Sequence, residues 1–394
     1  MTSSTPEAFA VIAHAWFDGE HLHCRPVTMT VRGGRIETIA GGDQSELLTL
    51  PSHRGAFLMP GMVDAHVHLA LNGALTDRAE RSDSLKADVS VIRDDAIARA
   101  HRALSSGVTV MRDAGDRHGI NHAVRAAAEH DGSLPKVISA GMGLRSQGGY
   151  GAFIAAELVD VASLDATMSR ISAQCDTLKL VISGLINFAA GGVLEPPQFD
   201  IPTARSIVDA AHHAGLKVMT HCSGEDALRV AVAAGVDSIE HGYFMTPAVL
   251  REMADRCTTW VPTFCPVHFQ WSQPQHAPWS DETVAHLRRI LDQHGEMLAL
   301  AIEYGVPLLT GTDAGSMGVV HGPAIVDEIE RFIEAGASLT LALSCATSKA
   351  RRFLGLPDPL LTVGARFDAC LLANSPFDQL AALRSPQQVW RGLE

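Results

Sequence analysis

The sequence predicts an α/β fold, a (β/α)8 barrel with a small β-sandwich domain built from both chain ends. Four segments share one pattern, in which a helix-like stretch precedes a glycine, a short apolar run and a polar residue: SSGVTVMRD, HAGLKVMTH, AAGVDSIEH and EYGVPLLTGTD. Glycine suits the left-handed residue just past a helix end, and such apolar runs are typical of parallel strands buried on both faces. Strands that alternate with helices indicate parallel βα units.

Weaker versions of this pattern bring the number of predicted strands to eight. Eight βα units close into a barrel whose functional residues lie at the C-terminal ends of the strands. An open doubly wound sheet is the alternative, but no G-x-G-x-x-G follows the first strand, and polar residues end many strands rather than one switch point. The eight strands are predicted at about residues 57–68, 108–113, 136–141, 177–183, 217–221, 237–241, 258–264 and 307–313.

The two ends of the chain show a different pattern. FAVIAHAWF and VTMTVRGGRIETIAGG alternate between apolar and polar residues and contain a hairpin turn at Gly33-Gly34, while FDACLLA and QQVWRGL resemble two more short strands. Chain ends are often close in space. We therefore expect residues 1–56 and 357–394 to form one β domain beside a barrel of residues 57–356.

Composition excludes several classes of partner. The chain has 394 residues and a formal charge of −13, which argues against a nucleic-acid or anionic-membrane surface. The N-terminus has no basic region followed by an apolar core, and no uncharged apolar run reaches ~18 residues. Seven cysteines without a C-x-x-C pair indicate reduced thiols. We expect a cytoplasmic homo-oligomer that acts on a small molecule and binds neither nucleic acid nor membrane.

The predicted strand ends carry residues that can bind metal. In MPGMVDAHVHLA, His66 and His68 are two positions apart, so on a strand they face the same side. Imidazole and carboxylate suit Zn²⁺, Fe²⁺ or Mn²⁺, and four histidines with an aspartate exceed what one catalytic metal usually takes, so two metals are expected. The residues that should converge at the barrel mouth are His66, His68, Lys179, His221, His241 and Asp313.

The role of Lys179 can be interpreted in two ways. Burial and positive neighbours lower a lysine pKa, and a neutral amine can react with CO₂ to give a carbamate whose oxygens could bridge two metals. A lysine in a strand more often forms a salt bridge, and the residue alone favours that reading.

These segments resemble motifs of the amidohydrolase superfamily. PGMVDAHVH is similar to its first-strand motif, LKLVISG to its carboxylated-lysine strand, and VMTHCSG, SIEHG and LLTGTDAG to its later His, His and Asp strands. The segment GGVLEPPQFDIPTARSIVDAAHHAGLKVMTHCSG resembles the branch related to imidazolonepropionase and Xaa-Pro dipeptidases, whose members hydrolyse dipeptides, N-acyl amino acids and some amide-linked toxins. Where that branch often has GGHG, this chain has QGGYG, so Tyr150 stands in place of a histidine. Tyrosine donates a hydrogen bond but carries no charge at neutral pH.

The resemblance implies a binuclear metal-dependent hydrolase of a C–N amide bond, with zinc as the expected metal and a carbamate on Lys179. In that mechanism a hydroxide held between the metals attacks the carbonyl. Asp313 binds a metal, accepts the proton and passes it to the departing amine. Tyr150 and His268 are candidates to stabilise the oxyanion or a substrate carboxylate, although His268 could be an ordinary loop histidine.

Two alternatives remain at this point. A deaminase of a cyclic amidine-like substrate would use one metal and a glutamate near His221, but Glu225 lies four residues further on. A non-catalytic scaffold of the same superfamily would show gaps among the metal ligands, and this sequence shows none.

Overall fold

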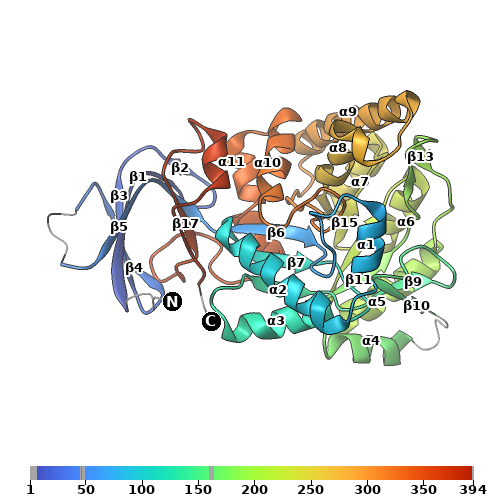
Figure 1. Ribbon diagram of the computed structural model, residues 1–394, viewed down its shortest axis with the longest axis horizontal. Helices are drawn as coiled ribbons and strands as arrows, with labels where there is room; N and C mark the ends of the chain where they lie inside the picture. Colours follow the sequence, from blue (N-terminus) through green and yellow to red (C-terminus); the bar gives the residue numbers. More distant parts are fainter. Residues whose placement is uncertain (1–6, 45, 47–48, 159–163, 393–394) are drawn as a thin grey trace.

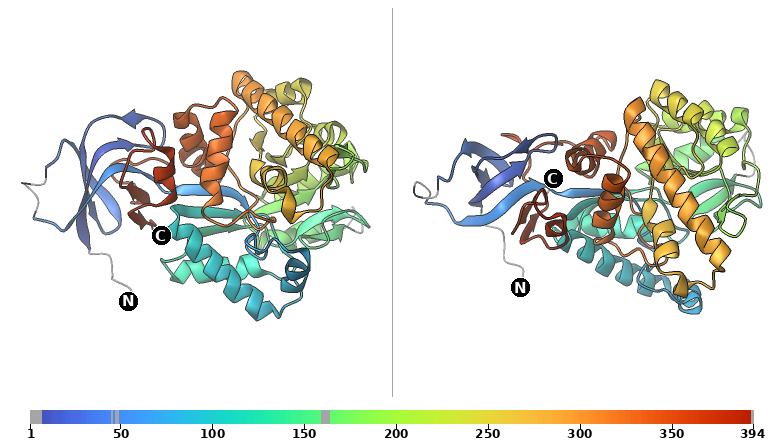
Figure 2. Two further views of the ribbon diagram at one scale, coloured as in Figure 1. Left: turned by 45° about the horizontal axis from the view of Figure 1, so that its top comes forward. Right: turned by 90° about the horizontal axis from the view of Figure 1, so that it is seen from above.

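A computed structural model describes residues 7–44, 46, 49–158 and 164–392. The described chain forms a barrel of parallel strands surrounded by helices, with a separate β-sheet at one end of the molecule (Figure 1). The further views in Figure 2 show the same arrangement. The fold is the predicted (β/α)8 barrel with strands of both chain ends beside it.

The barrel strands follow the predicted segments closely. They are β6 (Met62–Val67), β7 (Val108–Asp113), β8 (Lys136–Ser139), β11 (Thr177–Val181), β14 (Lys217–Cys222), β15 (Ser238–His241) and β16 (Thr259–Val261). They pair in parallel in the order β6-β7-β8 and β11-β14-β15-β16. The glycines of the repeated pattern have the expected left-handed backbone, with φ of 89° at Gly107, 78° at Gly215, 88° at Gly235 and 74° at Gly305.

The predicted eighth strand, residues 307–313, closes the ring through separate hydrogen bonds. On one side Trp260 N donates to Pro307 O (2.8 Å) and Leu309 N donates to Trp260 O (3.0 Å). On the other side Ala65 N donates to Thr310 O (3.0 Å) and Asp313 N donates to His66 O (2.8 Å). Between β8 and β11, Asp176 N donates to Ser139 O (2.9 Å).

Two features of the barrel differ from the prediction. The segment 57–68 is divided at Gly61, so that its first residues belong to β5 (Ser52–Pro60) in the end sheet and only β6 enters the barrel. In addition, β9 (Gly143–Ser146) and β10 (Ala155–Leu158) extend the sheet beyond β11, and a small hairpin, β12 (Ile186–Asn187) and β13 (Gly192–Val193), follows β11.

Helices cover the outside of the barrel, and several begin at a capping side chain. Asp200 caps α5 (Ile201–His213), Thr246 caps α7 (Pro247–Arg256) and Ser280 caps α9 (Asp281–Tyr304), each by accepting a backbone N–H in the first turn. The helices are α1 (Arg78–Ser84), α2 (Val89–Ser105), α3 (Ile120–His130), α4 (Leu164–Ser172), α5 (Ile201–His213), α6 (Glu225–Ala234), α7 (Pro247–Arg256), α8 (Phe264–Ser272), α9 (Asp281–Tyr304), α10 (Ala324–Glu334), α11 (Leu339–Cys345) and α12 (Ser348–Phe353), with 3₁₀ turns at Pro274–His276 and Leu380–Arg384. Within the described part of the chain, no helix has the length and apolar character needed to cross a membrane.

The end sheet joins the two termini of the chain. Its order is β18-β17-β5-β1-β3-β4, with β2 paired to β1. Its apolar core includes Phe9, Leu58, Phe367 and Trp390. The hairpin at Gly33-Gly34 is present, with positive φ at both glycines as a two-residue turn requires. The remaining strands are β1 (Ala8–Phe17), β2 (Leu22–His23), β3 (Val27–Arg32), β4 (Arg35–Gly41), β17 (Ala369–Leu372) and β18 (Gln388–Trp390).

Candidate active site

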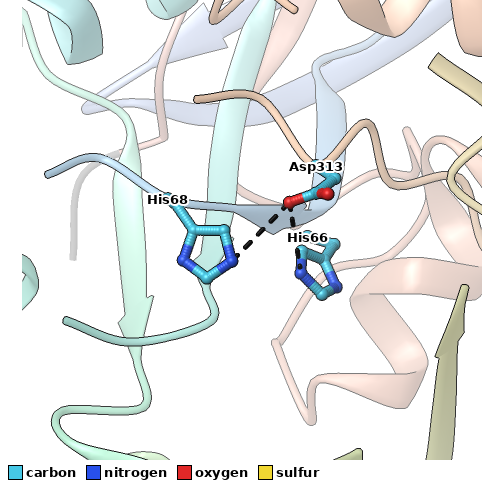
Figure 3. A group of neighbouring side chains, drawn as sticks. All are labelled: His66, His68 and Asp313. Carbon is cyan, nitrogen blue, oxygen red and sulfur yellow. Dashed lines mark ion pairs between the residues drawn. The ribbon is translucent and has the colours of Figure 1, made fainter. Parts of the chain in front are cut away.

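A cluster of two buried histidines and one half-buried aspartate lies at the C-terminal end of β6. His66 Nε2 is 3.7 Å and His68 Nε2 is 3.6 Å from Asp313 Oδ1 (Figure 3). One ligand atom from each of the three residues lies within 4.8 Å of the others. His66 Nε2 is buried and has no hydrogen-bond partner among the described residues. An orphaned buried nitrogen beside a carboxylate fits a metal-ligand position, because buried polar atoms otherwise find partners.

Two further histidines adjoin this cluster from the neighbouring strands. The ring centroid of His241 lies 5.0 Å from that of His66 and 4.6 Å from that of His221. Lys179, on β11, is 1% exposed, and it lines the same cavity as His68, His221, His241 and Asp313. The structure therefore brings all six predicted metal ligands to one place, and imidazole and carboxylate are donors that suit divalent metals.

Hydrogen bonds from neighbouring groups hold the histidine rings in place. His66 Nδ1 is 2.7 Å from Glu240 Oε2, and Glu240 Oε1 in turn accepts hydrogen bonds from Arg112 (2.8 Å) and from Ser238 Oγ (2.5 Å). His241 Nδ1 lies 2.8 Å from Thr263 Oγ1. His68 Nδ1 lies 3.1 Å from the carbonyl oxygen of Gly115. Such contacts orient each ring and leave the other nitrogen directed to the cluster.

The site favours neutral imidazoles and a partly neutral lysine. Burial lowers the pKa of His68 and His221 to about 3 and places the pKa of His66 and His241 well below the ordinary value, with the Lys179 charge adding to the effect. Burial also lowers the pKa of Lys179 to about 8, against the opposing charges of Glu240 and Asp313. Burial raises the pKa of Asp313 to about 6. Neutral imidazole and uncharged amine are the forms that bind metal and react with CO₂.

The backbone is strained at the same place. His241, Thr263 and Asp313 have φ of 69°, 51° and 54°, in the left-handed region that residues other than glycine seldom adopt. Each such residue costs on the order of 1–3 kcal/mol, and such strain concentrates at functional sites.

A cavity of about 220 Å³ opens above the cluster. Tyr150 lines it, and its ring centroid lies 5.3 Å from that of His221. His268 lies elsewhere: its Nε2 is 2.8 Å from Arg331, and it lines a separate hollow between α8, α9 and α10. Glu225 is also away from the cavity, paired with Arg229 (2.6 Å) on the surface of α6. The structure thus joins Tyr150 to the predicted ligands but not His268 or Glu225.

Sequence reasoning missed Glu240 and Arg112. In a regular strand, Glu240 and His241 would face opposite sides. The positive φ of His241 breaks this alternation, so both residues reach His66. An acidic residue directly before a predicted ligand in SIEHG, together with an arginine in the buried strand VTVMRD, was the available signal, because buried charges are paired.

Comparison with known proteins agrees with this geometry. Residues 57–392 match the amidohydrolase family. The chain belongs to the amidohydrolase family. This amidohydrolase is 30% identical to an uncharacterized protein of Mycobacterium tuberculosis over 92% of the chain and 90% of the relative. It is 25% identical to ochratoxinase of Aspergillus niger over 100% of the chain and 88% of the relative.

A solved structure with the same fold is that of a Xaa-Pro dipeptidase with bound methionine. The TM-score is 0.85 at 22% identity, covering 98% of this amidohydrolase and 99% of that chain. Family, relatives and the His-His-Asp cluster together identify a metal-dependent hydrolase.

Proposed function

We propose that this amidohydrolase uses two divalent metal ions, expected to be zinc, to hydrolyse a C–N amide bond of a dipeptide, an N-acyl amino acid or a related amide. The observation that carries the proposal is the convergence of six side chains on one cavity. They are His66, His68, Lys179, His221, His241 and Asp313. This set exceeds the three protein ligands that a single catalytic metal usually takes, which supports two ions.

Lys179 supports the second ion. Its position among four histidines, fully buried and with the pKa lowered to about 8, leaves part of the amine neutral near pH 7. Attack of Nζ on CO₂ forms an N–C bond and releases one proton, which gives a carbamate with two donor oxygens. Counted from the protonated lysine, two protons are lost in all, and a positive charge beside the histidines is replaced by a negative one.

The remaining roles fall to residues that line the cavity. Metal ions bound here would supply an ionised water near neutral pH and polarise the scissile carbonyl. Asp313 would accept a proton and donate it to the departing amine. Tyr150, whose pKa is raised by burial, stays protonated and would donate a hydrogen bond to the substrate.

Metal analysis and an amide panel test the proposal together. We expect about two equivalents of metal in the purified protein, and hydrolysis of at least one compound among dipeptides, N-acyl amino acids and simple amides. Lys179→Ala should lose metal and activity, with partial rescue by short carboxylic acids. Lys217→Ala, on the neighbouring strand, is the matched control. One firmly bound metal with deaminase activity, or unchanged metal content in Lys179→Ala, would contradict the proposal.

A further inference from the structure

The walls of the cavity above the ligands are apolar. They come from four separate parts of the chain: the segment after β6, the loop between β9 and β10, the β12–β13 hairpin and the start of α8. Their apolar members are Leu71, Phe153, Ile154, Leu185, Ile186, Phe188, Pro266 and Val267. The volume of about 220 Å³ is below the ~300–1,000 Å³ common for ligand pockets. The space therefore suits a compact group that buries apolar surface.

In the described part of the chain, the walls away from the predicted metal ligands offer a substrate no charged partner. Among the described residues that line the cavity, the only ionised or ionisable groups besides Tyr150 and Tyr243 are the predicted metal ligands. Two guanidinium groups lie near the cavity but outside its lining. That of Arg81 donates to the carbonyl oxygens of Asn72 (2.8 Å) and Gly315 (3.0 Å). That of Arg78 lies 5.7 Å from the centre of the Trp279 ring, which meets Phe188 edge-on. A substrate carboxylate held against these walls, away from the metal ligands, would lose its hydration without a cation to pair with it.

The neutral polar groups are mostly engaged within the protein. Thr263 contacts His241, Ser316 donates to Asp313, Tyr243 donates to the carbonyl oxygen of Thr263, and Ser223 accepts from the backbone of Tyr243. In the described part of the chain, the Tyr150 hydroxyl has no such hydrogen bond. The Tyr150 hydroxyl is therefore available to form a hydrogen bond with a polar atom of the substrate.

We infer that the substrate is a compact neutral amide with apolar substituents, and that a substrate carrying a free carboxylate next to the scissile amide is disfavoured. The inference rests on the proposed function and narrows its substrate class to neutral amides. It disfavours the dipeptides and N-acyl amino acids named there, because both carry such a carboxylate. On this view the apolar walls select the substrate, and the Tyr150 hydroxyl orients it through a hydrogen bond.

Two ligands of the same shape test this selection. N-benzoylglycine carries a carboxylate where N-isobutylbenzamide carries an isopropyl group of similar shape. Binding of each to the metal-loaded protein is measured by calorimetry, and hydrolysis is followed separately as release of benzoate. We expect N-isobutylbenzamide to bind at least tenfold more tightly.

A charge added at the rim should reverse the preference. Leu185 lines the cavity and is 54% exposed, so Leu185→Arg can be accommodated without burying a charge. We expect this variant to bind N-benzoylglycine at least tenfold more tightly than the parent does. Leu194→Arg is the matched control, since Leu194 is 65% exposed at the other end of the same hairpin and lies outside the cavity lining. We expect no change in preference there.

The outcomes separate the two proposals. Equal or tighter binding of N-benzoylglycine by the parent protein, or no binding of either ligand, overturns the inference. An equal gain in Leu194→Arg also overturns it, because the effect would then be general charge attraction. Binding in the expected order without hydrolysis of any amide in the panel supports the inference about the cavity and contradicts the proposed hydrolase function.

Discussion

At the scale of single residues, the site depends on one buried carboxylate that is not itself predicted to bind metal. Glu240 connects His66 to Arg112, and all three side chains are essentially unexposed. A buried arginine is tolerated only when it is paired and hydrogen-bonded. The pair therefore fixes the ring of His66 and balances a charge at the centre of the barrel.

Replacing Glu240 tests this role. Glu240→Gln keeps the shape of the side chain but removes the charge facing Arg112. We therefore expect metal affinity to fall by ~10–100-fold, as is usual when a residue that hydrogen-bonds to a metal ligand is replaced. The free energy of unfolding should fall by ~3–5 kcal/mol, the usual cost of breaking a buried pair. Metal titration and denaturant unfolding measure the two effects. Glu225→Gln, which breaks an exposed pair with Arg229, is the control and should change neither.

Asp313 carries the proposed proton transfer. Asp313→Asn cannot accept a proton, and general acid–base catalysis contributes ~10²–10⁴-fold. We expect kcat to fall by ~100-fold or more on any amide that the parent hydrolyses. Ser316→Ala, which removes only the hydroxyl that donates to Asp313 (2.9 Å), should have a smaller effect. Near-normal turnover by Asp313→Asn with full metal content would show that another group moves the proton.

At the scale of elements, neighbouring strands position the ligands by close backbone approach. Gly143 on β9 lies against Lys179 on β11, so that an added Cβ would be 2.6 Å from the carbonyl oxygen of Lys179 and 2.9 Å from its Cβ. Real Cβ atoms do not approach so closely. Glycine at residue 143 therefore allows β9 and β11 to approach closely enough to place Lys179 at the cluster.

Gly143→Ala should displace the lysine strand. We expect destabilisation by ~1–3 kcal/mol, the usual cost of overpacking, together with reduced metal content. Gly192→Ala in the β12–β13 hairpin is the control, because no atom lies within 4 Å of an added Cβ there. Thermal unfolding and metal analysis compare the two variants. Retention of metal and stability by Gly143→Ala would show that β9 can move without disturbing Lys179.

At the scale of the whole molecule, the barrel and the end sheet are joined by continuous backbone and buried charge. β5 of the end sheet runs into β6 of the barrel with only Gly61 between them. Asp368, just before β17, accepts hydrogen bonds from Thr109 on β7 (2.6 Å) and from Arg351 on α12 (2.6 Å). The end sheet is therefore fixed to the barrel. The division of the chain into units of residues 1–56, 57–356 and 357–394 stays a prediction.

Stability should depend on pH through buried acids distributed over the barrel. Burial raises the pKa of Asp64 and Asp113 to about 7 and that of Glu328 to about 8. Between about pH 5 and 8 these three acids keep protons that the unfolded chain has released, so their contribution to folding becomes less favourable as the pH rises. The buried histidines of the site act in the opposite direction below about pH 6.5, because burial lowers their pKa. A comparison with a variant therefore isolates the acids: the unfolding free energy of the metal-free parent, relative to that of Glu328→Gln, should fall by at least ~1 kcal/mol from pH 5 to pH 8, since one pKa unit corresponds to ~1.4 kcal/mol.

Denaturant unfolding at a series of pH values measures this trend. Glu328→Gln cannot titrate, so the parent should lose stability relative to this variant as the pH rises, with the change largest near pH 8. An identical pH dependence in the parent and the variant would contradict the assignment of a raised pKa to Glu328.

The sequence by itself determined the barrel, the order of its strands and the six residues that meet at its mouth. Buried parallel strands have a local signature in glycines and apolar runs, and a residue at the end of such a strand is placed by the fold class alone. Only the tertiary structure decided which loop residues join them. Glu240 reaches His66 across 174 residues, Tyr150 enters the cavity while His268 turns to Arg331, and the β12–β13 hairpin supplies an apolar wall. Such contacts depend on how separate loops pack, and periodicity within a single strand carries no information about that packing.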